Sequence, residues 1–547
     1  MAVNPIVIFM TVAYFAVIFG IGYVTRTASA NPMDYYVAGR KIGPVVNGAA
    51  LAATFLSPAS FLGLPAFIFL LGYPFWWAMV GIIGGMPLAT MLTAAPLRKY
   101  APISFTDYYC DRFEDQRWMR ILTGIPILMG TWAYVVLSLV GTGLFMMAIL
   151  QIPYVWAVAI GAVAVLFYVY MGGMVATTWS TAFQGVLMAV AAVVCGLAVL
   201  FHYGGFGNLA DAVFATTPNF WLMPYASEAG AVSHPLFKSW TGVVGFFFVW
   251  HFGFATMPYS VVRFFTAMDV KSARKSVVWT GVFGGAMYWG LIIIGTAARH
   301  LIETLHPLMG QILNTAEGPV TIANVTQVLT RIKSDFGVAG AAVTDYSMIA
   351  AIEALNNPWL LGLLVAGGLA IAMSTAAGWV VVGNVLLGRD WLGKAFGNKW
   401  AIENPIKSLR LMTVLILVVG VYYSFNPLAL VLDLSGWAFV MTVTTLGVPL
   451  VLGLWWPRAT RAATYATVMV FFPAVLYSWL HARSVLGSPH WFFLSKVLYG
   501  DDKALWISTP HQFYWVFVAF IFFIVVSLLT KPASKETIKL YCEDLHV

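Results

Sequence analysis

Residues 50–65 combine the composition of an apolar membrane helix with residues that interrupt helices. They read ALAATFLSPASFLGLP, with two prolines and three hydroxyl side chains inside a long apolar run. A broken helix releases backbone carbonyl groups, and the dipoles of its half-helix ends suit a cation at one end and a carboxylate at the other. Non-helical backbone is tolerated at membrane depth only where it is buried or lines a cavity. A simple proline kink is the alternative.

Ionisable side chains are almost absent from the apolar segments. Asp433 is the one acidic residue expected within a span, near its edge, and His251 is the one histidine expected at depth. This scarcity argues against a carboxylate-based proton pump and against a redox protein with bis-histidine haem. A bound cation would therefore need neutral oxygen ligands, and the adjacent Ser374 and Thr375 lie deep in another apolar run. The alternative for this pair is hydrogen bonding to its own helix or to a neighbouring helix.

The composition defines the class of protein. The 547 residues are 61% hydrophobic and 9% charged, which predicts an all-α polytopic membrane protein without a separate soluble domain. The apolar segment from Pro5 is expected to be a retained helix, with a cleaved signal peptide as the lesser alternative. Three scattered cysteines suggest neither disulfides nor zinc, and the net charge of +8 is explained by basic loops instead of nucleic-acid binding. No catalytic constellation is present, so no enzyme activity and no cofactor are expected.

Hydropathy predicts about thirteen transmembrane helices. With the N-terminus outside and the C-terminus cytoplasmic, 22 of the 29 Lys and Arg residues fall on the inner side, as the positive-inside rule requires. Arg263 is counted there as a charge at a cytoplasmic helix end; the alternative is that it draws anions toward the inner mouth. The predicted spans are 5–25, 44–72, 74–97, 118–150, 154–173, 179–204, 240–265, 276–298, 358–388, 406–425, 427–454, 461–481 and 512–530.

The seventh span is also interrupted, by Gly253 and Pro258 in WHFGFATMPYS. Spans 2–6 and 7–11 then form two five-helix groups of opposite orientation, each beginning with a broken helix. This arrangement predicts a 5+5 inverted-repeat core with an extra N-terminal helix and extra C-terminal helices. The expected segments of this single transporter domain are 1–43 (first helix and inner loop), 44–204 (first repeat), 205–239 (outer loop), 240–454 (second repeat, with outer loop 299–357), 455–530 (peripheral helices) and 531–547 (cytoplasmic tail).

Five ordered segments resemble the sodium/solute symporter family over roughly residues 34–460, and look most like its acetate and monocarboxylate permease branch. They are GRKIGPVVNGAALAATFLSPASFLGLPAFIFLLG from Gly39, FTDYYCDRFED (105–115), YMGGMVATTWSTAFQ (170–184), MPYSVVRFFTAMDVKSARKS (257–276) and NPWLLGLLVAGGLAIAMSTAAG (357–378). The resemblance implies a LeuT-like core, alternating access and a multi-pass location in the bacterial plasma (inner) membrane. It also suggests a small membrane accessory protein as a partner.

The resemblance further implies a sodium site. Its ligands would be the backbone carbonyls of Ala53, Leu56 and Ile371 and the hydroxyls of Ser374 and Thr375. Na⁺ is accordingly the expected coupling ion.

The sequence departs from the family pattern at positions where relatives carry aspartate. Sodium/proline symporters have an Asp at the position of Phe55, and the acetate branch has one at the position of Thr54. Several relatives have an Asp linked to a second cation or a proton route at the position of Thr181. These changes leave the core without a fixed negative charge, which weakens the case for a second sodium and suits an anionic substrate.

We therefore expect a symporter that imports a small monocarboxylate of the acetate, pyruvate, lactate or propionate class. The expected substrate ligands are Thr54, Ser57 and Ser60 around the break, with His251 and Tyr259 from the seventh span. A neutral or zwitterionic solute such as proline is the alternative cargo, and proton coupling is the alternative to sodium. A membrane sensor is disfavoured because only a short tail follows the last span.

Overall fold

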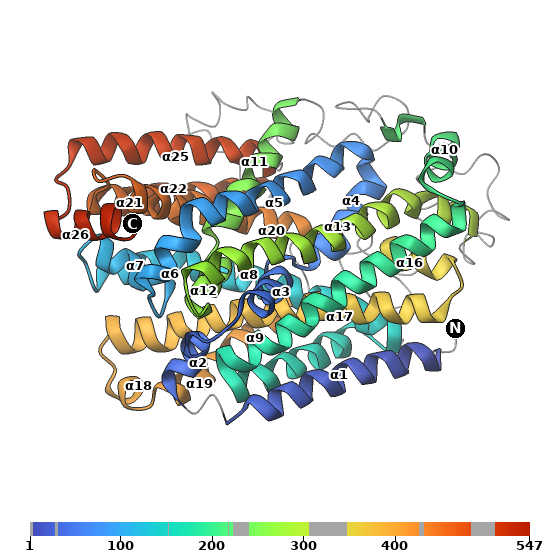
Figure 1. Cartoon of the computed structure of the whole chain (residues 1–547), viewed down its shortest axis with the longest axis horizontal. Coiled ribbons are helices and arrows are strands. Elements are labelled where there is room, and N and C mark those ends of the chain that lie inside the picture. The colour runs from blue at the N-terminus through green and yellow to red at the C-terminus, as the bar shows by residue number, and fades with distance from the viewer. Residues whose placement is uncertain are drawn as a thin grey trace.

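The computed structural model describes residues 4–27, 31–150, 152–216, 218–221, 240–305, 347–425, 431–482 and 509–546. These residues form helices that run mostly along one long axis (Figure 1), and their only β feature is an isolated bridge between Ile42 and Ala267. The described part is therefore all-α, as predicted. Most of the predicted outer loops (205–239, 299–357 and the segment after 482) lie outside the described residues.

The helices follow one another along the whole chain. They are α1 (Pro5–Thr25), α2 (Pro32–Val37), η2 (Ala38–Arg40), α3 (Pro44–Phe55), η3 (Ala59–Gly63), α4 (Leu64–Leu71), η4 (Tyr73–Phe75), α5 (Trp76–Ala89), η5 (Thr90–Ala94), α6 (Ala95–Tyr100), α7 (Phe105–Arg112), α8 (Trp118–Leu150), α9 (Tyr154–Tyr203), α10 (Phe206–Thr216), η6 (Pro218–Trp221), α11 (Trp240–Thr256), α12 (Pro258–Thr266), α13 (Val270–Leu305), α16 (Ser347–Ala354), α17 (Pro358–Asn384), η9 (Val385–Ala395), α18 (Lys399–Glu403), α19 (Pro405–Ser424), α20 (Val431–Thr442), η10 (Val443–Gly447), α21 (Val448–Trp455), α22 (Arg461–Ala482), α25 (Thr509–Leu529), α26 (Lys535–Lys539) and η11 (Leu540–Asp544).

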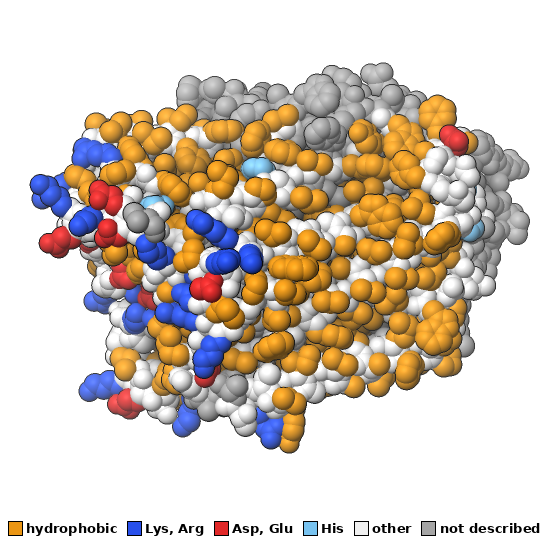
Figure 2. All heavy atoms as spheres, in the orientation of Figure 1, with side chains coloured by type: hydrophobic (Ala, Val, Ile, Leu, Met, Phe, Trp, Pro, Cys, Tyr) orange, Lys and Arg blue, Asp and Glu red, His pale blue; other side chains and the backbone are white. Residues whose placement is uncertain are grey.

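Seven of the described helices are long and apolar enough to cross a membrane, or eight if one bent pair is counted as a span. All thirteen predicted spans coincide with helical structure, and the 50-residue α9 is divided by Gly173 (φ 52°, ψ −140°) between two of them. The count of thirteen remains a prediction. Apolar side chains cover most of the face shown in Figure 2. The Lys and Arg residues visible there gather at the end that carries α18 and α26, here named the basic end.

Both predicted helix interruptions are present. Helices Pro44–Phe55 and Ala59–Phe69 are bent by 64° at a short break, where Leu56 adopts extended backbone (φ −77°, ψ 98°). Between α11 and α12, Met257 is extended (φ −68°, ψ 133°) and Pro258 begins the next helix. Proline suits a first helical position because its missing N–H is not needed there. Around these two breaks, α17 packs against α8 and α9, and α13 packs against α3 and α9.

An ion-pair network closes the packing at the basic end. Asp107 of α7 lies 2.8 Å from Arg120, 2.9 Å from Arg389 and 3.1 Å from Lys394, while Asp390 lies 3.3 Å from Arg120 and 2.5 Å from Arg389. Asp107, Arg120 and Asp390 are buried. A buried charge is tolerated when it is paired and hydrogen-bonded, so this network ties α7, α8 and η9 together at the basic end.

Removing one partner of this network should destabilise the fold. Burial alone would raise the pKa of Asp107, but Arg389, Lys394 and Arg120 outweigh it and hold that pKa well below its ordinary value. The Asp107 carboxylate therefore contributes fully above about pH 4, and its contribution is lost as the pH falls through the depressed pKa. We expect Asp107→Asn to lower the free energy of unfolding by about 3 kcal/mol at pH 7. Thermal unfolding in detergent at several pH values measures this.

The matched control is Glu403→Gln, an exposed carboxylate at the end of α18. Its effect should stay within about 0.5 kcal/mol. Equal effects of the two substitutions at pH 7, or a difference that persists unchanged far below pH 4, would contradict the role assigned to Asp107.

Candidate functional site

Five neutral oxygens converge where α3 ends beside α17. The single proton of the Ser374 hydroxyl can be donated either to the carbonyl oxygen of Ala53 (2.7 Å) or to that of Ile371 (2.9 Å). Thr375 Oγ1 lies 3.5 Å from the carbonyl oxygens of Ala53 and Leu56. All five residues are buried. The structure thus brings the predicted cation ligands together, and a set of hard oxygen ligands without a carboxylate suits a small monovalent cation.

Local backbone geometry explains why these carbonyls are available. In α3 the last helical bond runs from the Leu56 N–H to the Ala52 carbonyl, so the next carbonyls have no partner within the helix. The C-terminus of α3 also carries the negative end of the helix dipole, equivalent to about half a charge, which favours a cation. The break therefore supplies both the oxygen ligands and part of the negative electrostatic potential that would attract a cation.

The three hydroxyls predicted to bind substrate surround the break but are already engaged. Ser57 Oγ accepts a bond from the Ala59 N–H (3.2 Å), and Ser60 Oγ pairs with the hydroxyl of Tyr288 on α13 (2.9 Å). Thr54 Oγ1 donates to its own helix. The structure places these hydroxyls on different sides of the break and does not bring them to one point.

Tyr259 and His251 occupy different surroundings. Tyr259, at the start of α12, lies with its ring 4.9 Å from Trp379 and 6.0 Å from Phe55. His251 stacks on Phe247 of its own helix and faces α5, where a Cβ on Gly84 would lie 2.8 Å from its Nδ1. Tyr259 is therefore beside the break, whereas the described contacts of His251 are with α5.

An aromatic cage, formed by Phe55, Tyr134, Tyr259, Trp379 and Phe439, covers the break. Tyr134 of α8 stacks on Trp379 at 4.9 Å, and Phe439 of α20 lies 6.0 Å from Phe55. The hydroxyls of Tyr134 and Tyr259 face each other, yet neither they nor the Trp379 indole N–H makes a hydrogen bond of good geometry with the described residues. Sequence analysis missed Tyr134 and Trp379 because isolated aromatic residues in an aromatic-rich chain give no distinguishing pattern.

Arg263 is the clearest correction to the sequence analysis. Arg263 does lie in the last turn of α12, but its side chain is not a surface charge: the residue is 1% exposed and lies in the core. Its Nη1 donates to Thr178 Oγ1 (2.8 Å), and its Nη2 donates to the hydroxyls of Thr54 (3.0 Å) and Thr181 (3.3 Å). Arg263 lies one turn after Tyr259, on the face of α12 that meets α3 and α9.

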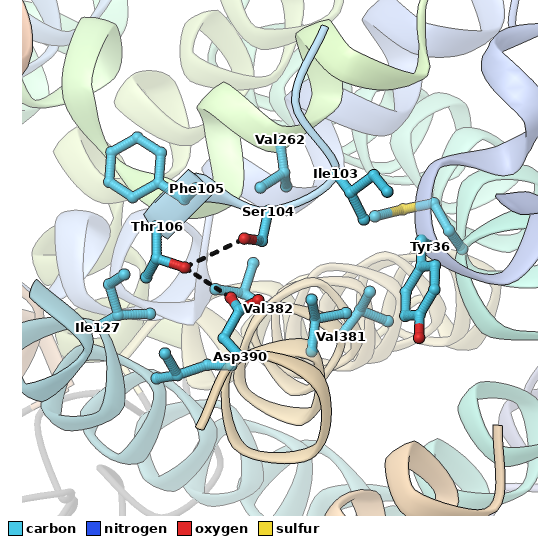
Figure 3. Close-up of a pocket in the computed structure, with 13 residues that line it drawn as sticks. Tyr36, Ile103, Ser104, Phe105, Thr106, Ile127, Val262, Val381, Val382 and Asp390 are labelled. Atoms are coloured by element: carbon cyan, nitrogen blue, oxygen red, sulfur yellow. Dashed lines mark hydrogen bonds between the residues drawn. The ribbon is translucent and has the colours of Figure 1, made fainter. Parts of the chain in front are cut away.

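A narrow cavity of about 20 Å³ lies between Arg263 and the basic end. One ordered water would fill it. Figure 3 shows Ser104, Thr106 and Asp390 joined by hydrogen bonds on one side, with Tyr36 on the other. Its remaining lining is mostly apolar and comes from Ile103 and from α7, α8, α9, α12, α17 and η9.

A helical membrane bundle with two interrupted helices, one of which ends at a cluster of neutral oxygens beside α17, has the features of a LeuT-like transporter fold. The model of the sodium:solute symporter family matches residues 35–470, and the chain belongs to this family. A Na⁺-coupled sialic acid symporter in a substrate-bound outward-open state is similar in structure, with a TM-score of 0.69 and 15% identity over 97% of this chain and 99% of that chain. Mhp1, a nucleobase-cation-symport-1 family transporter, has a TM-score of 0.50 and 14% identity over 94% and 99%.

The oxygen cluster depends on close approach of α17 to α3 at Gly378. A Cβ at this position would lie 2.2 Å from Thr54 Cγ2, and Thr54 is itself held by Arg263. We expect Gly378→Ala to force the helices apart, at a cost of about 1–3 kcal/mol, and to abolish stabilisation by added cation. Thermal unfolding in detergent with and without Na⁺ measures both effects.

Gly285→Ala in α13 is the control, because an added Cβ there meets nothing within 4 Å. It should keep the cation response. An undiminished cation response in Gly378→Ala would show that the oxygen cluster does not need this close approach.

Proposed function

We propose that this protein imports a small monocarboxylate of the acetate, pyruvate, lactate or propionate class together with Na⁺, by alternating access. The observation that carries the proposal is the cluster of five buried neutral oxygens between α3 and α17. It lies beside an aromatic cage with hydrogen-bond donors that lack partners among the described residues. Family membership supports coupling to sodium. The choice of a monocarboxylate as the transported solute rests on the chemistry of this core.

We further propose a bacterial inner-membrane location with the N-terminus outside and the C-terminus in the cytoplasm. The basic end would then face the cytoplasm, since the Lys and Arg residues visible in Figure 2 gather there. The assignment of 44–204 and 240–454 as the two inverted repeats belongs to the same proposal. A small membrane accessory protein remains a candidate partner on resemblance alone.

Sodium would act by joining α3 to α17. In the structure the Ser374 hydroxyl donates its proton to the Ala53 carbonyl. When Na⁺ binds, both hydroxyls would rotate to present a lone pair, and the carbonyls of Ala53, Leu56 and Ile371 would complete the ligand set. Binding energy shared between two helices biases their relative position, which is how an ion can select one of two conformations.

The substrate carboxylate would bind next to this cation. Its ligands would be the hydroxyls of Tyr134 and Tyr259 and the indole N–H of Trp379, with the hydroxyls of Ser57 and Ser60 released from their present partners. A carboxylate and Na⁺ that move together form a neutral pair, which avoids the cost of burying either charge alone. A zwitterion such as proline, or coupling to protons, is the alternative that competition and gradient experiments separate.

Removal of the two hydroxyls should abolish coupling to sodium. We expect an inward Na⁺ gradient to drive uptake of radiolabelled acetate or pyruvate, but not proline, into proteoliposomes. Ser374→Ala and Thr375→Ala should each reduce it at least about ten-fold, since each loses a direct ligand worth about 1.5–3 kcal/mol. Proton-driven uptake that is insensitive to both substitutions would remove the sodium site from the proposal.

Thr123→Ala is the matched control, because among the described residues the Thr123 hydroxyl bonds only to the carbonyl of Met119 in its own helix. It should transport like the unsubstituted protein. Preferred uptake of proline over both carboxylates would reject the monocarboxylate and keep the fold.

The aromatic donors should set the affinity for the carboxylate. We expect Tyr259→Phe to raise KM for the monocarboxylate about ten-fold with little change in Vmax, because a hydrogen bond to a charged group contributes about 1.5–3 kcal/mol. The control is Tyr154→Phe, because Tyr154 is not part of the aromatic cage and its hydroxyl donates to the Ser424 carbonyl. If Ser57→Ala, Ser60→Ala and Tyr259→Phe all leave KM unchanged, the pocket lies elsewhere.

A further inference from the structure

The positive charge of Arg263 has no negative partner in the part of the chain that the structure describes. The three threonines that surround its guanidinium each donate their own proton to a backbone carbonyl of the same helix, namely those of Ala50, Met174 and Thr177. Their hydroxyls can therefore only accept from Arg263, and they satisfy its N–H groups without balancing its charge. In contrast, the buried charges of the network at the basic end are paired with opposite charges.

An unbalanced guanidinium in a water-excluded core attracts an anion. Guanidinium groups match carboxylates in geometry as well as in charge, since parallel N–H groups can bind both carboxylate oxygens. The adjoining cation site makes the attraction stronger, because Thr54, whose hydroxyl accepts from Arg263, also contributes the carbonyl 3.4 Å from Thr375 Oγ1. With sodium bound, two positive charges would lie in this region and no carboxylate of the described residues balances them.

One contact of the guanidinium is weak, and the residue that makes it lines the cavity. Nη1 of Arg263 lies 3.9 Å from Met174 Sδ, and a thioether is a poor acceptor. Met174 and Val262, the neighbour of Arg263, both line the cavity that continues to Thr106 and Asp390. Methionine has a flexible unbranched side chain, so its displacement would connect the guanidinium with this cavity.

We propose that Arg263 is a second anion site, between the aromatic cage and the cavity at the basic end, which receives the carboxylate of the transported solute on its way to the cytoplasm. The inference rests on the proposed function. The carboxylate would leave Tyr259, bind one turn further along α12 at Arg263 in place of the thioether contact, and then enter the cavity. Arg263 thus provides an intermediate binding position on the release side, and no covalent step is involved.

Paired substitutions isolate the charge of the site. Arg263→Gln removes the charge and Arg263→Lys keeps it, while Thr181→Asp places a carboxylate against Nη2 and Thr181→Asn is its neutral match. We expect net efflux of radiolabelled pyruvate from loaded proteoliposomes to be at least about ten-fold slower in Arg263→Gln than in Arg263→Lys. Net efflux is likewise expected to be at least about ten-fold slower in Thr181→Asp than in Thr181→Asn.

Thermal unfolding separates this role from a structural one. Thr181→Asp adds an ion pair to Arg263, so a purely structural arginine would give a protein at least as stable as Thr181→Asn with equal efflux. Slower efflux without loss of stability supports the anion site. Equal efflux in Thr181→Asp and Thr181→Asn, or in Arg263→Gln and Arg263→Lys, overturns it.

A binding measurement distinguishes the source of the anion and does not depend on transport. The melting temperature in detergent is compared in sodium acetate, sodium chloride and the bulkier sodium isethionate at one Na⁺ concentration. Acetate should raise it most, with a smaller rise in Arg263→Gln than in Arg263→Lys. A rise caused by chloride alone would overturn the carboxylate as ligand, and equal rises in both variants would overturn the site. An Arg263-dependent acetate effect without acetate or pyruvate uptake would keep the anion site at Arg263 but reject both the proposed function and the role of this site in release.

Discussion

The structure depends on backbone carbonyls that α3 releases where it ends inside the bundle. An unsatisfied carbonyl in a membrane core costs several kcal/mol, so the break is stable only because α17 supplies hydroxyl donors at that point. The hydroxyls of Ser374 and Thr375 donate to the carbonyls of Ala53 and Leu56, respectively. The close approach of the helices at Gly378 makes these contacts possible. The same oxygens can be shared with an ion, so the feature that holds two helices together is also the one that a cation can strengthen.

Charge is distributed very differently in the core and at the basic end. At the basic end, Asp107 and Asp390 neutralise Arg120 and Arg389 within a compact network. In the core, the guanidinium of Arg263 donates hydrogen bonds to threonine hydroxyls, and no carboxylate of the described residues neutralises its charge. Two unit charges 4 Å apart interact by about 4 kcal/mol at an effective dielectric constant of 20, so this imbalance favours anions and disfavours a second cation.

The aromatic cage shows how the two broken helices share one site. Phe55 at the end of α3 and Tyr259 at the start of α12 come from different halves of the chain, and Trp379 of α17 and Tyr134 of α8 complete the enclosure. Opposed helix ends give the enclosure a negative and a positive side. A cation and a carboxylate can therefore lie next to each other, each at the helix end that stabilises it.

Composition, proline and glycine positions and the rarity of charge were enough to predict an all-α membrane protein, both helix breaks and neutral oxygens at Ser374 and Thr375, because these features follow from local backbone chemistry and from the cost of burying charge. Resemblance added the carbonyls of Ala53, Leu56 and Ile371. Only the tertiary structure decided that Arg263 turns inward, that His251 faces α5, and that Tyr134 and Trp379 enclose the break. Those outcomes depend on which helix faces meet, and a single sequence does not encode that geometry in any short-range pattern.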